Sequence, residues 1–193
     1  AASMTAALGL ATTGDCSYAP ALRTLVTQME KGAKAYLYPN KKLNQARAAN
    51  LAIAVKSLGL NPKKFAGYDL VSLVTKSLPK SGRIGASDSA FSQSLGIIAL
   101  KRANATIPVT LLTKLLSLQG RDGSFGYTWD GTFNADPDTT AMGVLSLHAL
   151  GQLAPQEGAA VGWALDAQLA DGSWPNEYSP VDSTALLASA MKV

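Results

Sequence analysis

Apolar positions along the chain recur at helical spacing, in runs separated by short polar connections, and no convincing two-residue alternation competes with them. The runs predict helices at residues 2–12, 20–36, 43–58, 67–78, 88–103, 108–119, 138–151, 156–169 and 181–192. Glycine and proline, which end helices, follow many of these runs, as at Gly59, Gly120 and Gly151. The pattern therefore predicts an all-α protein.

Two kinds of helix alternate in this prediction. The runs at 43–58, 88–103, 138–151 and 181–192 are rich in Ala, Ser and Gly and are apolar on most faces, which indicates burial on both sides. The runs between them, such as 108–119, keep one polar face. We therefore expect an inner row of helices covered by an outer row.

One sequence motif occurs twice, at residues 119–125 (QGRDGSF) and 168–174 (QLADGSW), and a fainter copy covers residues 81–85. The Asp-Gly pair supplies turn chemistry, and a glutamine amide can satisfy backbone groups at a helix end. The aromatic residue that ends each full copy, Phe125 or Trp174, is expected to wedge between successive repeats. We interpret the motif as a structural staple in a repeat protein.

The motif resembles the QW motif of the terpenoid cyclase and protein prenyltransferase superfamily. The resemblance covers residues 68–193, and helical periodicity alone extends it back to residue 1. It implies an α/α toroid, in which inner helices lie inside a ring of outer helices. The sequence shows fewer helical hairpins than a closed ring of this type has, so we expect an incomplete or open ring. We treat residues 1–193 as one repeat domain that is part of a longer protein.

An acidic stretch, Asp-Pro-Asp-Thr-Thr at residues 136–140, resembles the Asp-x-Asp-Asp motif of class II terpene cyclases. That resemblance implies Asp138 as a general acid, with Asp136 beside it. Helix capping is the alternative, because an Asp at the start of a helix accepts backbone N–H bonds and favours the helix dipole. Asp88, Asp138 and Asp182 each precede Ser or Thr at the start of a predicted inner helix. This recurrence favours capping, and catalysis by Asp138 and Asp136 stays as the alternative.

The polar segment 126–135 contains three aromatic residues, Tyr127, Trp129 and Phe133, and is longer than the loop of the other copies. Aromatic residues among polar neighbours on a rim loop are typical of recognition surfaces, and the alternative is that they cover the end of the core. We predict a binding site formed by these three residues together with Asp138 and with Tyr178 from the next repeat.

Residues 138–147 also resemble the Asp-Thr-x-Ala-Met inner helix of the transcobalamin and intrinsic factor group, which are secreted binding proteins. The leading hypothesis is a non-catalytic, extracytoplasmic bacterial domain, secreted or at the cell surface. It would bind a small molecule, protein or polymer at one rim and need no cofactor. The alternatives are a class II terpene cyclase-like enzyme and a structural spacer.

Metal chemistry has little support in the sequence. Cys16 is the single cysteine, which excludes a multi-cysteine zinc site. His148 is the single histidine, has no partner motif, and is expected to be buried or to face the lumen. No metal site is therefore predicted.

The formal charge of +4 is unevenly distributed along the chain. Residues 1–120 carry a net +11 and residues 121–193 a net −7. We interpret this as a polarised solvated outer surface, and the alternative is a basic face that meets an anionic polymer, an anionic surface or a head-to-tail partner. Nucleic acid is not expected, because the lysines are spread over several helices without interleaved aromatic residues. No apolar run is long enough to span a membrane.

Overall fold

The computed structural model describes residues 2–85, 87–151, 154–176 and 179–192, and most of them lie in helices. The α-helices in these residues are α1 (Ala2–Thr12), α2 (Ala19–Leu37), α3 (Gln45–Ser57), α4 (Leu70–Thr75), α5 (Ala90–Arg102), α6 (Val109–Leu116), α7 (Pro137–Leu150), α8 (Ala154–Ala167) and α9 (Pro180–Ala190). Three short 3-10 helices, η1 (Cys16–Tyr18), η2 (Pro39–Lys41) and η3 (Pro62–Lys64), and a hairpin of β1 (Gly126–Trp129) and β2 (Thr132–Ala135) complete the described elements. The predicted, mainly helical architecture is confirmed.

The largest difference from a predicted helix length is at α4. The expected helix at 67–78 is reduced to α4, because Asp69 caps its start by accepting a hydrogen bond from the Ser72 backbone N–H (3.0 Å). Lys76 is extended and Ser77 has a φ of 57°, so the backbone leaves the helical region after Thr75.

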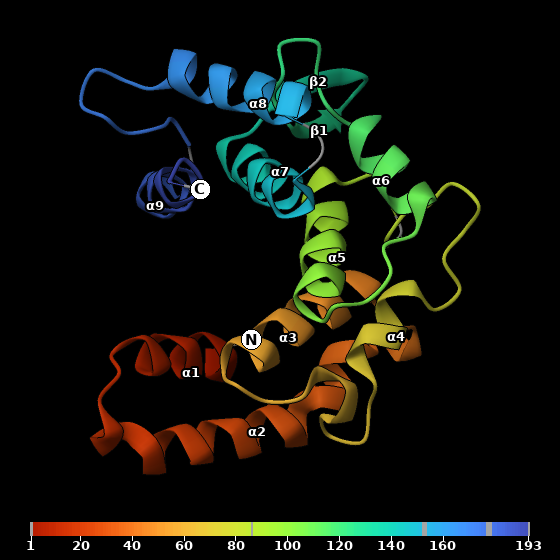
Figure 1. Ribbon diagram of the computed structural model, residues 1–193, viewed down its shortest axis with the longest axis vertical. Helices are drawn as coiled ribbons and strands as arrows, with labels where there is room; N and C mark the ends of the chain where they lie inside the picture. Colours follow the sequence, from red (N-terminus) through yellow and green to blue (C-terminus); the bar gives the residue numbers. More distant parts are fainter. Residues whose placement is uncertain (1, 86, 152–153, 177–178, 193) are drawn as a thin grey trace.

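The helices pack in the alternating order that their composition predicted. α3, α5, α7 and α9 contact one another in sequence, while α4 packs on α3, α6 on α5 and α8 on α7. α1 and α2 pack together and both contact α3. Figure 1 shows these elements following an open arc, with α4, α6 and α8 on its outer side.

The glutamine of each full motif bonds the turn that follows it. Gln119 Nε2 donates to the Gly123 carbonyl oxygen (2.8 Å), and Gln168 Nε2 donates to the Gly172 carbonyl oxygen (2.9 Å). Gln119 Nε2 also donates to the carbonyl oxygen of Gln156, at the start of α8 (2.9 Å). The amide therefore satisfies backbone acceptors as the sequence analysis expected.

The aspartate of each motif holds the serine two residues later. Asp122 Oδ1 accepts from the backbone N–H (3.1 Å) and the hydroxyl (2.7 Å) of Ser124, and Asp171 Oδ1 accepts from the same groups of Ser173 (3.0 and 2.6 Å). These two bonds lower the pKa of Asp171, and the bond from the Ser173 hydroxyl has the larger effect. The two turns thus share one hydrogen-bond pattern.

The residue that ends each motif is tied to the next helix of the inner row. The Phe125 backbone N–H donates to Thr140 Oγ1 (3.0 Å), and the Trp174 backbone N–H donates to Thr184 Oγ1 (3.1 Å). Both aromatic side chains are buried, and the Trp174 indole donates to the Ala164 carbonyl oxygen (2.7 Å). The prediction that the two aromatic residues occupy equivalent positions between repeats is confirmed.

The fainter copy at 81–85 follows the same plan with different residues. The Ile84 backbone N–H donates to Gln93 Oε1 (2.6 Å), and Gln93 Nε2 donates to the Gly82 carbonyl oxygen (3.0 Å). Ile84 and Gln93 are both buried. A glutamine on α5 therefore replaces the threonine of α7 and α9.

A glycine on the inner helix makes room for the motif's apolar side chain. A Cβ atom on Gly143 of α7 would lie 2.2 Å from Cδ2 of Phe125, and one on Gly96 of α5 would lie 2.2 Å from Cδ1 of Ile84. At Gly143 three atoms of the Phe125 ring would lie within 3.0 Å of the new Cβ, so this position requires glycine for packing, whereas at Gly96 only the end of the Ile84 side chain would have to shift.

We predict that Gly143→Ala lowers the free energy of unfolding by about 1–3 kcal/mol, because the added methyl group overpacks against the Phe125 ring. Gly162→Ala on α8 is the matched control, since no heavy atom lies within 4 Å of its new Cβ. It should raise stability by up to about 1 kcal/mol through helix propensity. Urea unfolding followed by circular dichroism measures both, and equal stability of the two variants would contradict the packing role of Gly143.

Candidate functional site

The predicted binding loop is a two-stranded antiparallel hairpin. Its turn residues Asp130 and Gly131 both have positive φ, 47° and 75°, as a two-residue turn between twisted strands requires. Tyr127 pairs with Asn134, and Trp129 pairs with Thr132. The expectation of an irregular loop at 126–135 was wrong, because the Asp-Gly turn fixes a strand register that short alternation alone had not indicated.

The base of the hairpin is held against the start of α7. Thr140 Oγ1 donates to the Phe125 carbonyl oxygen (2.9 Å), and the Asp136 backbone N–H donates to the same oxygen (3.0 Å). A Cβ atom on Gly126 would lie 1.9 Å from the Asn134 carbonyl oxygen, so the first residue of β1 must be glycine. The hairpin is thus a fixed extension of the repeat.

The three aromatic residues of the hairpin lie on two different faces. Paired residues of antiparallel strands share a face and neighbours along a strand alternate, so Tyr127 and Trp129 share one face and Phe133 lies on the other. Tyr127 is 53% exposed and Trp129 is 75% exposed. The structure therefore brings together two of the predicted aromatic binding residues.

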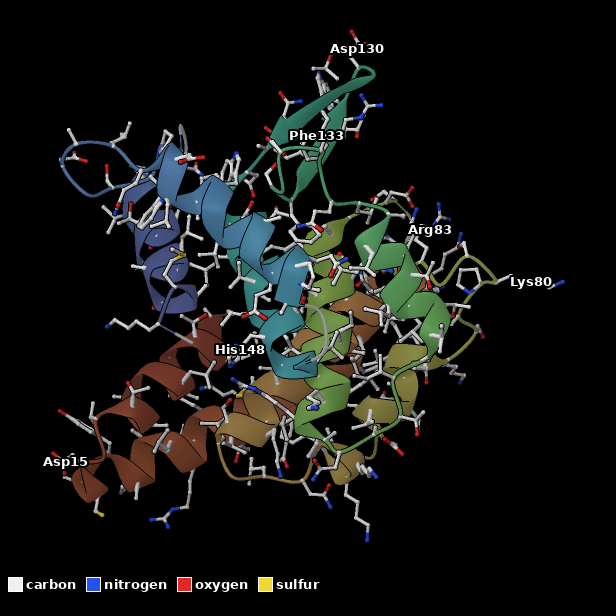
Figure 2. All side chains as sticks on the ribbon, turned by 45° about the horizontal axis from the view of Figure 1, so that its top comes forward. Asp15, Lys80, Arg83, Asp130, Phe133 and His148 are labelled. Carbon is white, nitrogen blue, oxygen red and sulfur yellow. The ribbon has the colours of Figure 1, made fainter. Side chains whose placement is uncertain are left out.

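Phe133 is 40% exposed, and one edge of its ring lies against the motif turn. Its Cε1 atom lies 2.8 Å from the position that a Cβ on Gly120 would take, so the ring rests on the backbone of the motif turn. Figure 2 shows Asp130 at the tip of the hairpin and Phe133 nearer to the helices. Phe133 therefore braces the hairpin from behind the face that carries Tyr127 and Trp129.

Capping of α7 falls to Asp136 and not to Asp138. Asp136 has extended φ and ψ, and its Oδ1 accepts a hydrogen bond from the Thr139 backbone N–H (2.7 Å). The helix begins at Pro137, which places Asp138 in the first turn. The Asp138 Oδ1 atom is buried, and no hydrogen-bond partner for it is found in the described part of the chain. The expectation that Asp138 is the cap was wrong.

Asp88 and Asp182 are not caps either. Ser89 caps α5 through a hydrogen bond from the Ser92 backbone N–H (3.2 Å), and Asp88 forms an ion pair with Lys114 (2.7 Å). At α9 the flanking residue is Ser179, which makes no side-chain cap bond and donates through Oγ to Asp182 Oδ2 (2.6 Å). The three recurrent aspartates therefore have three different environments.

The remaining site predictions are placed as follows. Tyr178, expected opposite the hairpin, lies outside the described residues. His148 was expected to be buried or to face the lumen, but its side chain is 51% exposed and its Nδ1 lies 3.0 Å from Glu157 Oε1 of α8. Cys16 is exposed. Among the described residues no group of three or more His, Cys, Asp or Glu side chains is arranged to hold a metal ion.

The described cavities lie away from the hairpin. The largest of them has a volume of about 610 Å³ and is formed by α2, η2 and the turn before α4. Neither Trp129 nor Phe133 lines any of these cavities. The hairpin instead offers a protruding aromatic surface.

Comparison with known proteins adds no family assignment. A scan against protein-family models finds no match for this chain, and a search of curated proteins finds none either. In the described part of the chain, no helix combines the length and apolar character that crossing a bilayer requires.

We predict that Asp136→Ala lowers the free energy of unfolding by about 1 kcal/mol, because the Thr139 backbone N–H loses its acceptor. Asp136→Asn keeps an acceptor oxygen and should retain nearly all of that stability. Thermal unfolding of the two variants measures the difference. A larger loss in Asp138→Ala than in Asp136→Ala would contradict this assignment of the cap.

Proposed function

We propose that this chain is a non-catalytic binding module that recognises a protein partner through the Tyr127–Trp129 face of its hairpin. The observation that carries the proposal is the exposure of these two aromatic side chains on one face of a braced hairpin, 53% for Tyr127 and 75% for Trp129. Repeat packing accounts for the burial of Phe125 and the placement of Phe133, but it makes no use of this face.

The energetics favour recognition by these two residues. Large aromatic side chains bury about 150–250 Å² each when covered, and Tyr and Trp are enriched among the residues that dominate interface energy. Thr132 and Asn134 share their face, and Asn134 Nδ2 donates to the Thr132 carbonyl oxygen (3.0 Å). The face is therefore amphipathic. Because the hairpin is fixed at its base, little conformational freedom remains to be lost on binding.

The shape of the site favours a macromolecular partner. Small ligands are normally enclosed in concave pockets that bury most of their surface, whereas this hairpin protrudes from the helices (Figure 2). A partner with a hollow of its own fits a protrusion of this kind. A polypeptide is therefore the favoured member of the ligand classes that the sequence left open.

The finer fold assignment is part of the same proposal. The repeated motif turns, the alternation of inner and outer rows and the resemblance to the QW motif support an open α/α toroid. The resemblance of residues 138–147 to the transcobalamin and intrinsic factor group supports an extracytoplasmic, secreted or surface location. A binding module without chemistry is consistent with both.

We predict that the double variant Tyr127→Ala, Trp129→Ala weakens partner binding by about 2 kcal/mol or more, which is roughly thirtyfold. Its free energy of unfolding should change by less than about 0.5 kcal/mol, because both side chains are mostly exposed. The assay is selection of binders from a displayed library of protein domains, followed by affinity measurement with wild type and variant. Tyr18→Ala, at an exposed tyrosine far from the hairpin in sequence, is the control.

Two results would contradict the proposal. If wild type and double variant select the same binders with the same affinity, the hairpin face is not the recognition surface. If the double variant loses much of its stability instead, the face is a structural cover and not a binding site.

A second candidate function rests on Asp138. Its buried Oδ1 atom has no hydrogen-bond partner among the described residues, a feature that the capping explanation leaves unused. By resemblance to class II terpene cyclases, this residue would protonate an alkene or an epoxide. Phe91 is the one aromatic residue of α3, α5, α7 and α9, whereas carbocation chemistry gains from several aromatic faces. The binding module is therefore preferred.

Incubation with squalene and with its epoxide separates the two candidates. We expect neither wild type nor Asp138→Asn to form a cyclic product, as judged by mass spectrometry of the extract. If the wild type forms a cyclic product and Asp138→Asn does not, the chain is an enzyme with Asp138 as its general acid. That result would contradict the proposal of a non-catalytic binding module.

A further inference from the structure

A cavity formed by α2, η2 and the turn before α4 shares no residue with the hairpin of the proposed function. Its volume is about 610 Å³. Its lining consists of Lys31, Lys34, Ala35, Tyr38, Lys41 and Tyr68, and we name it the basic groove. Figure 1 shows its main element, α2, at the opposite end of the molecule from β1 and β2.

One face of α2 forms a wall of the basic groove. Lys31, Lys34, Ala35 and Tyr38 follow one another at the spacing of residues that share a helix face. Tyr38 ends the helix, and its backbone N–H donates to the Lys34 carbonyl oxygen (3.0 Å). The small Ala35 between two long lysines and a tyrosine leaves the wall hollow.

The turn after α2 sets the position of the third lysine. Asn40 and Lys41 have φ values of 53° and 62°, a backbone region that residues other than glycine rarely adopt. The Lys41 backbone N–H donates to the Tyr38 carbonyl oxygen (3.1 Å), which closes the turn. Holding two successive non-glycine residues in the left-handed backbone conformation costs free energy, and such conformations are concentrated at ligand sites.

The opposite wall is anchored to the core. Tyr68 and Phe65 exchange both backbone hydrogen bonds (3.1 and 2.9 Å), and Phe65 is buried. The Tyr68 ring lies 6.1 Å from the Tyr38 ring, centroid to centroid, at an angle of 41°. The two tyrosines, which come from distant parts of the chain, therefore meet as an angled pair in the groove.

The groove lies in a part of the chain with excess positive charge, although Glu30 precedes Lys31 on α2. Residues 31–76 contain nine Lys or Arg residues and a single acidic residue, Asp69. The Asp69 carboxylate is already bonded to the Ser72 backbone N–H and hydroxyl. Among the described residues, the ammonium groups of Lys31, Lys34 and Lys41 have no carboxylate within 4.0 Å. A concave surface lined by one sign of charge concentrates counter-ions.

We propose that the basic groove binds an anionic oligosaccharide, a polyhydroxylated chain that carries carboxylates on its sugar units. Tyrosine rings offer apolar faces to the C–H faces of sugars and hydroxyl groups to their oxygens. Lysines act as point charges toward carboxylates. Lys31 and Lys34 lie on the same face of α2, so their ammonium groups can approach neighbouring carboxylates of one chain.

Nucleic acid fits this groove less well. No arginine lines it to bind phosphate through two parallel hydrogen bonds. The tyrosine rings contact each other at 41° and so do not present parallel platforms for successive bases. The proposal also stands apart from the hairpin, because the groove and the hairpin share no residue.

The test is isothermal titration with hexagalacturonate at low and at physiological ionic strength. We expect binding that weakens as salt rises, since exposed charge pairs are screened, and no comparable binding of the fully methyl-esterified hexasaccharide. The variant Lys31→Gln, Lys34→Gln, Lys41→Gln should lower the affinity about tenfold. All three lysines are exposed, so the variant should keep the stability of the wild type.

The matched control removes the same charge elsewhere. In Lys80→Gln, Lys101→Gln, Lys192→Gln the three lysines are also exposed and none lines the groove, so the affinity should fall less than about twofold. Equal losses in the two triple variants, or equal binding of the uncharged ester, would overturn the proposal. Tighter binding of a single-stranded oligonucleotide of equal charge would replace it with a nucleic-acid surface. Self-association that only the groove variant abolishes would replace it with docking of a second copy.

Discussion

A hydrogen bond from a loop to the next inner helix, buried in two of its three copies, is the interaction on which the rest of this structure depends. It joins the Phe125 backbone N–H to Thr140 and the Trp174 backbone N–H to Thr184, and in the faint copy it joins Ile84 to Gln93. An unpaired buried amide would cost about 1–3 kcal/mol, so each bond fixes where a loop meets the following helix. Since repeats contact only their neighbours, the order of the whole arc follows from this local constraint.

The same constraint positions the candidate site. Phe125 is bound to Thr140 through both its N–H and its carbonyl oxygen, so the chain that leaves it at Gly126 must start beside the first turn of α7. The hairpin can then extend only away from the helix, and Asp136 returns to the Phe125 carbonyl to close its base. The exposure of Trp129 is thus a consequence of how the repeat is stapled. A site on such a support keeps its geometry without help from a ligand.

Hydrophobic period and motif spacing predicted the helices and the staple because both are local properties of the sequence. The cap of α7 was misassigned because two aspartates, Asp136 and Asp138, flank Pro137, and the choice depends on a helix start that periodicity locates only within a few residues. The hairpin was missed although Asp130-Gly131 lies between alternating residues, a signal that the surrounding helices outweighed. The pairing of Tyr38 with Tyr68 had no local signal, since it depends on how α2 packs beside the turn before α4.

The two proposed surfaces rely on different physical forces, and this difference lets one molecule use both. The hairpin face offers apolar area whose burial is largely insensitive to salt, whereas the groove offers uncompensated charge that is screened over about 8 Å at physiological ionic strength. Figure 1 shows α2 and the hairpin on opposite sides of the molecule, so we expect occupation of one surface to leave the other accessible. The net +11 of residues 1–120 attracts anions to the half that contains the groove, and the net −7 of residues 121–193 repels them from the half that contains the hairpin. If both proposals hold, an anionic polymer would be drawn toward the groove and repelled from the acidic half that carries the hairpin, and charge would direct the two ligands to different surfaces.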